Sequence, residues 1–159
     1  MKIYITYPLL LLILLNSVFA KAETFIGKII PPTPIGCESV GASIISAEFK
    51  FAYEQLVCNA ENVFLLEEQY ERNEKGIRWK IIDELKLPPF KNELKVLYPL
   101  CQSNKYPGTL LVIGEWGETK ADGTFRAKTI KAAWLFNTNR KKVESIPTSD
   151  IVCEGENSD

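Results

Sequence analysis

The sequence predicts an all-β protein, an antiparallel meander that forms a small sandwich or barrel held by two disulfides. Three observations favour this fold class. Apolar and polar residues alternate in several segments, turn residues separate these segments at short intervals, and four cysteines follow an apparent export segment. An α+β fold with one helix near residues 39–57 is the alternative.

The N-terminal residues have the composition of a secretory signal peptide. Lys2 supplies a positive start, residues 9–15 are an unbroken apolar run, and small residues surround Ala20. This run is shorter than the roughly 20 residues that a transmembrane helix needs. We therefore predict a signal peptide at residues 1–20, a periplasmic or secreted location, and no membrane attachment after cleavage.

All four cysteines lie in the part of the chain that follows the predicted signal peptide. An even number of cysteines in an exported chain indicates disulfides, and four cysteines allow three connectivities. We favour Cys37–Cys58 with Cys101–Cys153, because both pairs are sequential and close the shorter loops. The chain has no histidine and no C-x-x-C motif, so we expect no metal and no cofactor.

Residues 21–153 are predicted to form a single β-rich domain. Residues 24–30 are rich in β-forming residues and end at a proline run, and two glycines place Cys37 in a loop or irregular segment. The alternation from Ile45 to Tyr53 then predicts a long, half-buried strand that runs toward Cys58.

The next two strands are expected at residues 63–70 and 78–87, with a hairpin tip between them. Glu67, Glu68 and Glu71 form a row of acidic residues that could oppose a basic partner, with a solvated strand face as the alternative. Five further strands are expected, at residues 94–98, 109–116, 125–136, 142–146 and 150–153. Among them, residues 109–116 are the most hydrophobic and predict a central strand, whereas residues 154–159 predict a frayed acidic tail.

Composition excludes several classes of function. Without histidine the chain cannot build a Ser-His-Asp or Cys-His catalytic group. It contains no phosphate-binding glycine motif. Its charges are scattered and sum to −1, which disfavours a nucleic acid as partner.

Two groups of residues are candidates for partner binding. Glu115, Trp116 and Glu118 place two carboxylates around an indole, an arrangement that sugar binding or sugar hydrolysis uses. Arg140, Lys141 and Lys142 form a cationic hairpin tip that could receive an acidic partner. Plain structural roles are the alternative for both groups.

We expect an exported, non-enzymatic protein that binds another macromolecule, as inhibitors and immunity proteins do. The contacts are expected at residues 115–124 and 137–142, and the expected partner is a protein. The enzymatic alternative is a carboxylate-based hydrolase of cell-wall or extracellular sugar that uses Glu115 and Glu118. An envelope structural component is a further alternative.

Overall fold

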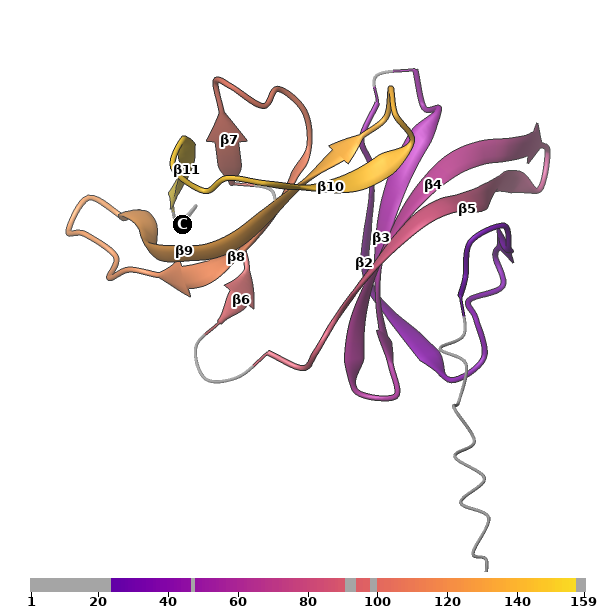
Figure 1. The fold of residues 1–159 in the computed structure, drawn as a ribbon, viewed down its shortest axis with the longest axis horizontal. Coiled ribbons are helices and arrows are strands. Elements are labelled where there is room, and N and C mark those ends of the chain that lie inside the picture. Colours follow the sequence, from indigo (N-terminus) through magenta and orange to yellow (C-terminus); the bar gives the residue numbers. More distant parts are fainter. Residues whose placement is uncertain (1–23, 47, 91–93, 98–99, 157–159) are drawn as a thin grey trace, which may run out of the picture.

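The computed structural model describes residues 24–46, 48–90, 94–97 and 100–156, which form two antiparallel β-sheets (Figure 1). The all-β fold class is therefore confirmed, and the helix considered near residues 39–57 is replaced by strands. The predicted signal peptide lies outside the described residues. Within these ranges no helix has the length and apolar character that crossing a membrane requires.

The first sheet has five strands, in the order β1-β5-β4-β3-β2. Strands β2 to β5 are consecutive antiparallel hairpins, and β1 pairs with β5 at the opposite edge. The strands are β1 (Ile29–Ile30), β2 (Cys37–Ile44), β3 (Phe51–Cys58), β4 (Glu61–Asn73) and β5 (Gly76–Leu87).

The second sheet has six strands, in the order β6-β8-β9-β11-β7, with β10 also paired to β9. Strand β8 pairs along one side of β9. On the other side of β9, β10 pairs with one end and β11 pairs with the opposite end. The strands are β6 (Lys95–Val96), β7 (Cys101–Ser103), β8 (Leu110–Trp116), β9 (Thr124–Asn137), β10 (Lys142–Ile146) and β11 (Ile151–Glu156).

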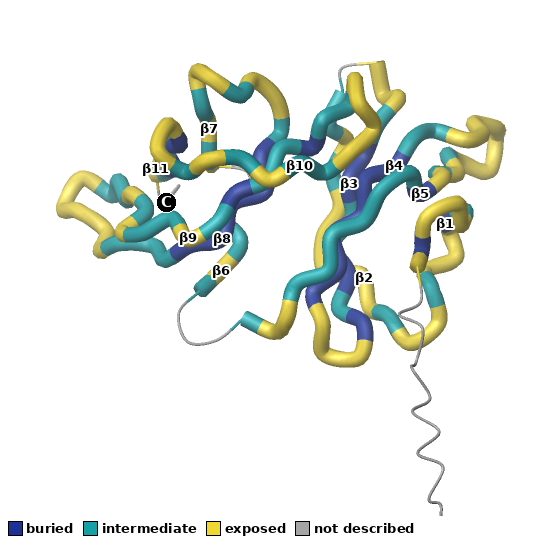
Figure 2. The backbone as a smooth tube through the Cα atoms, in the orientation of Figure 1, coloured by how far each residue is buried: buried dark blue, intermediate teal, exposed yellow. Residues whose placement is uncertain are grey.

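Apolar side chains form three layers, one between the sheets and one on the outer face of each sheet. In the middle layer Tyr53 of the first sheet stacks on Phe136 of the second, with ring centroids 5.3 Å apart. Successive side chains of β8 point alternately into the middle layer and into the outer layer of the second sheet. This strand is therefore buried on both faces, which confirms the central strand predicted at residues 109–116 (Figure 2).

Each sheet contains one disulfide, and both favoured pairings are confirmed. Cys37–Cys58 joins the start of β2 to the end of β3, and Cys101–Cys153 joins β7 to β11. The sequence separations are 21 and 52 residues. For loops of this size the chain-entropy model gives about 3 and about 4 kcal/mol of stabilisation.

The β9–β10 hairpin connects the second sheet to the first (Figure 1). The Val143 backbone N–H donates to Oδ2 of Asp83 on β5 at 2.7 Å. The Lys141 ammonium donates to both carboxylate oxygens of Glu68 on β4, at 2.7 and 2.8 Å. These contacts add polar links to the apolar layer between the sheets.

The strand predicted from Ile45 begins only at Phe51. The Ser46 hydroxyl accepts the backbone N–H groups of Lys50 and Phe51, at 2.9 and 3.0 Å, and so closes a turn. A serine that bonds to nearby backbone in this way competes with strand pairing. The apolar–polar alternation of the sequence begins before this turn ends. The prediction from alternation alone therefore started the strand too early.

Two further segments differ from the sequence prediction. Residues 37–44 form the edge strand β2 instead of a loop, because all of them except the bulged Val40 pair with β3. Strand β11 continues to Glu156, where pairing with β9 and a 2.7 Å ion pair between Glu154 and Arg126 order part of the expected frayed tail. Residues 157–159 of that tail and Tyr98 of the expected strand at 94–98 lie outside the described residues.

Candidate functional site

The structure does not gather Glu115 and Glu118 around one hollow. Glu115 pairs with Thr129 of β9, whereas Glu118 is exposed beyond the end of β8. A shallow hollow is lined by Trp116 and Glu118 but not by Glu115. Trp116 also packs edge-on against Phe125, with ring centroids 4.9 Å apart, so its indole contributes to the outer layer of the second sheet.

The predicted cationic tip is largely neutralised within the chain. Lys141 binds Glu68, and Arg140 binds Glu144 at 3.0 Å. Lys142 is exposed and pairs with Asn137 in the β9–β10 ladder. Trp116 pairs with Ala127, near the other end of β9. At the strand rise of roughly 3.3 Å per residue, the two predicted regions lie about 30 Å apart.

A pocket of about 570 Å³ opens on the outer face of the first sheet, where no site was predicted. All five strands of the sheet border it, including the edge strands β1 and β2, so the sheet curls around it. Its apolar wall includes Ile30 of β1, Ile44 of β2 and Trp79 of β5. Two carboxyl groups also line it, Glu54 from β3 and Glu67 from β4.

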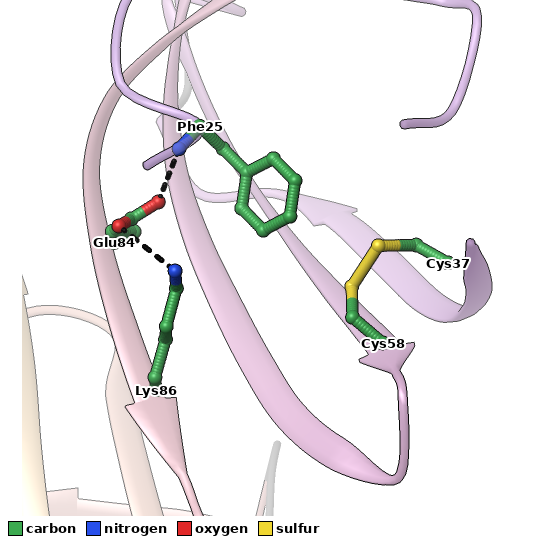
Figure 3. Close-up of a disulfide and its surroundings, with 5 residues drawn as sticks. All are labelled: Phe25, Cys37, Cys58, Glu84 and Lys86. Carbon is green, nitrogen blue, oxygen red and sulfur yellow. Dashed lines mark hydrogen bonds and ion pairs between the residues drawn. A yellow bond between two sulfur atoms is a disulfide. The ribbon is translucent and has the colours of Figure 1, made fainter. Parts of the chain in front are cut away.

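The pocket exists because the outer face of this sheet is filled only toward its other end. There Phe25 packs in the apolar cluster that includes the Cys37–Cys58 disulfide (Figure 3). The Phe25 backbone N–H donates to Oε2 of Glu84 at 2.7 Å, and Glu84 also pairs with Lys86. At the pocket end, the small side chain of Ala52 leaves space beside Glu67.

Glu67 is the one Asp, Glu, Lys or Arg side chain that is buried among the described residues. It lies opposite Ala52 in the sheet and is only 3% exposed, and its Oε1 has no hydrogen-bond partner. Burial raises the pKa of Glu67 to about 8, and the negative charge of Glu54 and a hydrogen bond with it act in the same direction. Glu67 is therefore mostly a neutral acid at pH 7.

The acidic row predicted on β4 is divided between the two faces of the sheet. Glu67 belongs to the outer face with Val63 and Leu65, while Glu68 faces the second sheet and binds Lys141. Glu71, farther along, binds the guanidinium of Arg78. The sequence signal for Glu67 was its place in the alternation of Val63 and Leu65, which assigns it to a buried face.

Comparisons with models of known protein families, with curated proteins and with solved structures give no match. Among the described residues no group of three or more His, Cys, Asp or Glu side chains is arranged to hold a metal ion. The two disulfides suggest an oxidising compartment outside the cytoplasm and are consistent with an exported protein.

Proposed function

We propose that this is an exported, non-enzymatic protein that binds another protein through the outer edge of β2. Inhibitors of exported hydrolases and immunity proteins act in this way, by holding a rigid surface against a partner. The disulfides support export, because such bonds persist in oxidising compartments.

The free edge of β2 is the main support for this function. In the described part of the chain β2 ends the first sheet, and no strand pairs with its outer side. An unpaired edge presents backbone N–H and C=O groups at the spacing that an added strand requires. Val40 and Ile44 on this strand are exposed, at 51% and 42%. The expected occupant is therefore an extended segment of the partner with apolar side chains.

Local structure makes this edge rigid and selective. The Cys37–Cys58 disulfide fixes one end of β2 to β3. A bulge at Val40 shifts the register between Ser39 and Gly41. Bulges on edge strands discourage pairing with a second copy of the same chain, so the edge favours a partner shaped to fit it.

We place the contact at β2 and not at the two regions predicted from the sequence. Arg140 and Lys141 already have acidic partners within the chain. The hydrolase alternative gains no support from the geometry, because Glu115 does not share a hollow with Glu118.

Site-specific photocrosslinking tests this function. A photoreactive phenylalanine at Val40 should crosslink one discrete protein in the native compartment, and Val40→Lys with Ile44→Lys should abolish that complex without changing the melting temperature. Tyr70 is the matched control, because it is 56% exposed on β4 of the same sheet but away from the edge. Equal crosslinking from Tyr70, or a complex that survives both lysine substitutions, would contradict binding at the β2 edge.

A further inference from the structure

The pocket on the first sheet has acidic groups but no basic group in its wall. Glu54 and Glu67 come from neighbouring strands and lie diagonally across the β3–β4 ladder, on the same face. No lysine or arginine is among the described residues that line the pocket. The nearby Lys80 of β5 pairs with Glu68 in the ladder and so belongs to the opposite face.

The unsatisfied carboxyl oxygen of Glu67 indicates what the pocket lacks. Buried carboxyl groups almost always have a hydrogen-bond donor or a cation as partner, because leaving such a group unpaired costs free energy. The Glu67 side chain has a hydrogen bond with Glu54, but its Oε1 has neither a donor nor a cation as partner, although the side chain is almost completely buried. A donor in the pocket would supply the missing partner once the Glu67 carboxyl turns toward it, because Oε1 itself has almost no accessible surface.

The rest of the wall suits an apolar chain. Ile30, Ile77 and Trp79 supply most of the large apolar side chains. The volume of about 570 Å³ lies in the range of small-molecule pockets, about 300 to 1,000 Å³. An indole ring can also attract a cation through its π face.

We propose that this pocket binds an organic cation, an ammonium or guanidinium group carried on an apolar chain. The cation would lie against Glu67 and Glu54, and the chain would pack on Trp79 and the isoleucines. The cation could belong to a free amphiphilic amine or to a lysine or arginine side chain of a protein segment. This inference does not depend on partner binding at β2.

Binding should release a proton from Glu67. The neutral carboxyl loses its proton to solvent, and the resulting carboxylate pairs with the incoming cation, so the charges balance. Glu54 of β3 is the other titratable group that faces Glu67. The neighbouring side chains of β5 and β2 carry no titratable group; they are Trp79, Ile81, Ser43 and Ile44. Affinity should therefore rise as the pH increases toward about 8, the pKa of Glu67.

Calorimetry on the mature protein tests the charge preference with three probes of similar length. Hexylammonium should bind saturably, and hexanol and hexanoate should bind at least about tenfold more weakly. Glu67→Gln and Glu54→Gln should each weaken hexylammonium binding at least about tenfold. Glu61→Gln is the matched control on β4, and it should leave binding unchanged because Glu61 is exposed and does not line the pocket.

Two results would overturn the proposal. The first is hexanol binding as tightly as hexylammonium, and the second is undiminished binding by Glu67→Gln and Glu54→Gln. Unfolding does not confuse the outcome for Glu67→Gln, because glutamine resembles the protonated acid that the folded state already holds at this position and should preserve the fold.

A pair of peptides distinguishes the source of the cation. An acetylated five-residue strand peptide with a central lysine is compared with the same peptide carrying norleucine. If the lysine peptide binds at least tenfold more tightly than hexylammonium and norleucine abolishes binding, the cation belongs to a protein segment. If the lysine peptide binds more weakly than hexylammonium, the cation belongs to a small molecule. Equal binding of the lysine and norleucine peptides would contradict recognition of a cation.

Discussion

The two sheets each contain one disulfide and one outer apolar layer, but they cover that layer differently. In the second sheet β7 and β11 fold over the outer face, and Ile151 and Cys153 pack against Leu110 and Val112. In the first sheet Phe25 packs only on the disulfide end. The other end holds Glu67 and a pocket of about 570 Å³.

This difference shows where the fold has room for a ligand. Both disulfides join directly paired residues of neighbouring strands. In the second sheet these strands, β7 and β11, also cover the outer apolar layer, whereas in the first sheet β2 and β3 leave the outer face partly open. A buried carboxyl beside such an opening reduces stability unless something binds it. The first sheet is therefore the better place for a ligand.

Removing the disulfides should have the largest effect and should rank the two sheets. Cys101→Ser with Cys153→Ser is expected to lower the free energy of unfolding by about 4 kcal/mol, and Cys37→Ser with Cys58→Ser by about 3 kcal/mol. The longer loop and the loss of the covering strands explain the order. Denaturant titration of both double variants measures the two losses of unfolding free energy. A larger loss from Cys37→Ser with Cys58→Ser would contradict the view that β7 and β11 cover the second sheet more completely.

Shortening Phe25 should open the filled end of the first sheet. Phe25 is 6% exposed, so Phe25→Ala should cost about 3 kcal/mol. Phe49 is 49% exposed and serves as the control, since Phe49→Ala should cost less than about 0.5 kcal/mol. Thermal unfolding of the two variants checks this, and similar losses would mean that Phe25 does not seal the outer layer.

Replacing Glu67 should stabilise the protein in a pH-dependent way. The pKa of Glu67 is raised to about 8 from an ordinary value of 4.5, so between these values the unfolded chain loses a proton that the folded chain keeps. Native stability therefore falls as the pH rises through this window, and Glu67→Gln escapes the loss. The variant should match the native protein at pH 4 and exceed it by about 2 kcal/mol at pH 6. Denaturant titrations at both pH values test the sign, and a variant less stable at pH 6 would contradict it.

Breaking the contact between the sheets at Lys141 should have the smallest effect. Lys141 and Glu68 are partly exposed, at 51% and 35% of their side-chain surface. Lys141→Ala should therefore cost at most about 1 kcal/mol. A double-mutant cycle with Glu68→Gln isolates the pair. A coupling energy well above this value would mean that the hairpin contact, and not the apolar middle layer, holds the sheets together.

The strands could be predicted from the sequence wherever the alternation was long and uninterrupted. The fold class, the disulfide pairs and the central strand β8 all followed from residue pattern and cysteine spacing. The start of β3 did not, because Ser46 bonds to backbone in a way that alternation cannot show. The edge strand β2 was missed because exposed small residues and a bulge hide its pattern.

The pocket could not be predicted because it depends on how the sheet curls. Glu54 and Glu67 are distant in sequence and meet only when β3 and β4 pair in one particular register. The burial of Glu67 could have been inferred because it shares a strand face with Val63 and Leu65. The empty space beside it could not, because it depends on where the covering segment with Phe25 ends.

Each sheet is built from one uninterrupted stretch of chain, residues 29–87 and 95–156. Neither disulfide crosses from one stretch to the other. A cut between Leu87 and Lys95 would therefore leave every strand of the described residues with its own sheet and both disulfides intact. The two fragments would be held by the stacked rings of Tyr53 and Phe136 and by the β9–β10 hairpin. The chain is in this respect a natural candidate for fragment complementation, in which two separately produced halves reassemble on mixing.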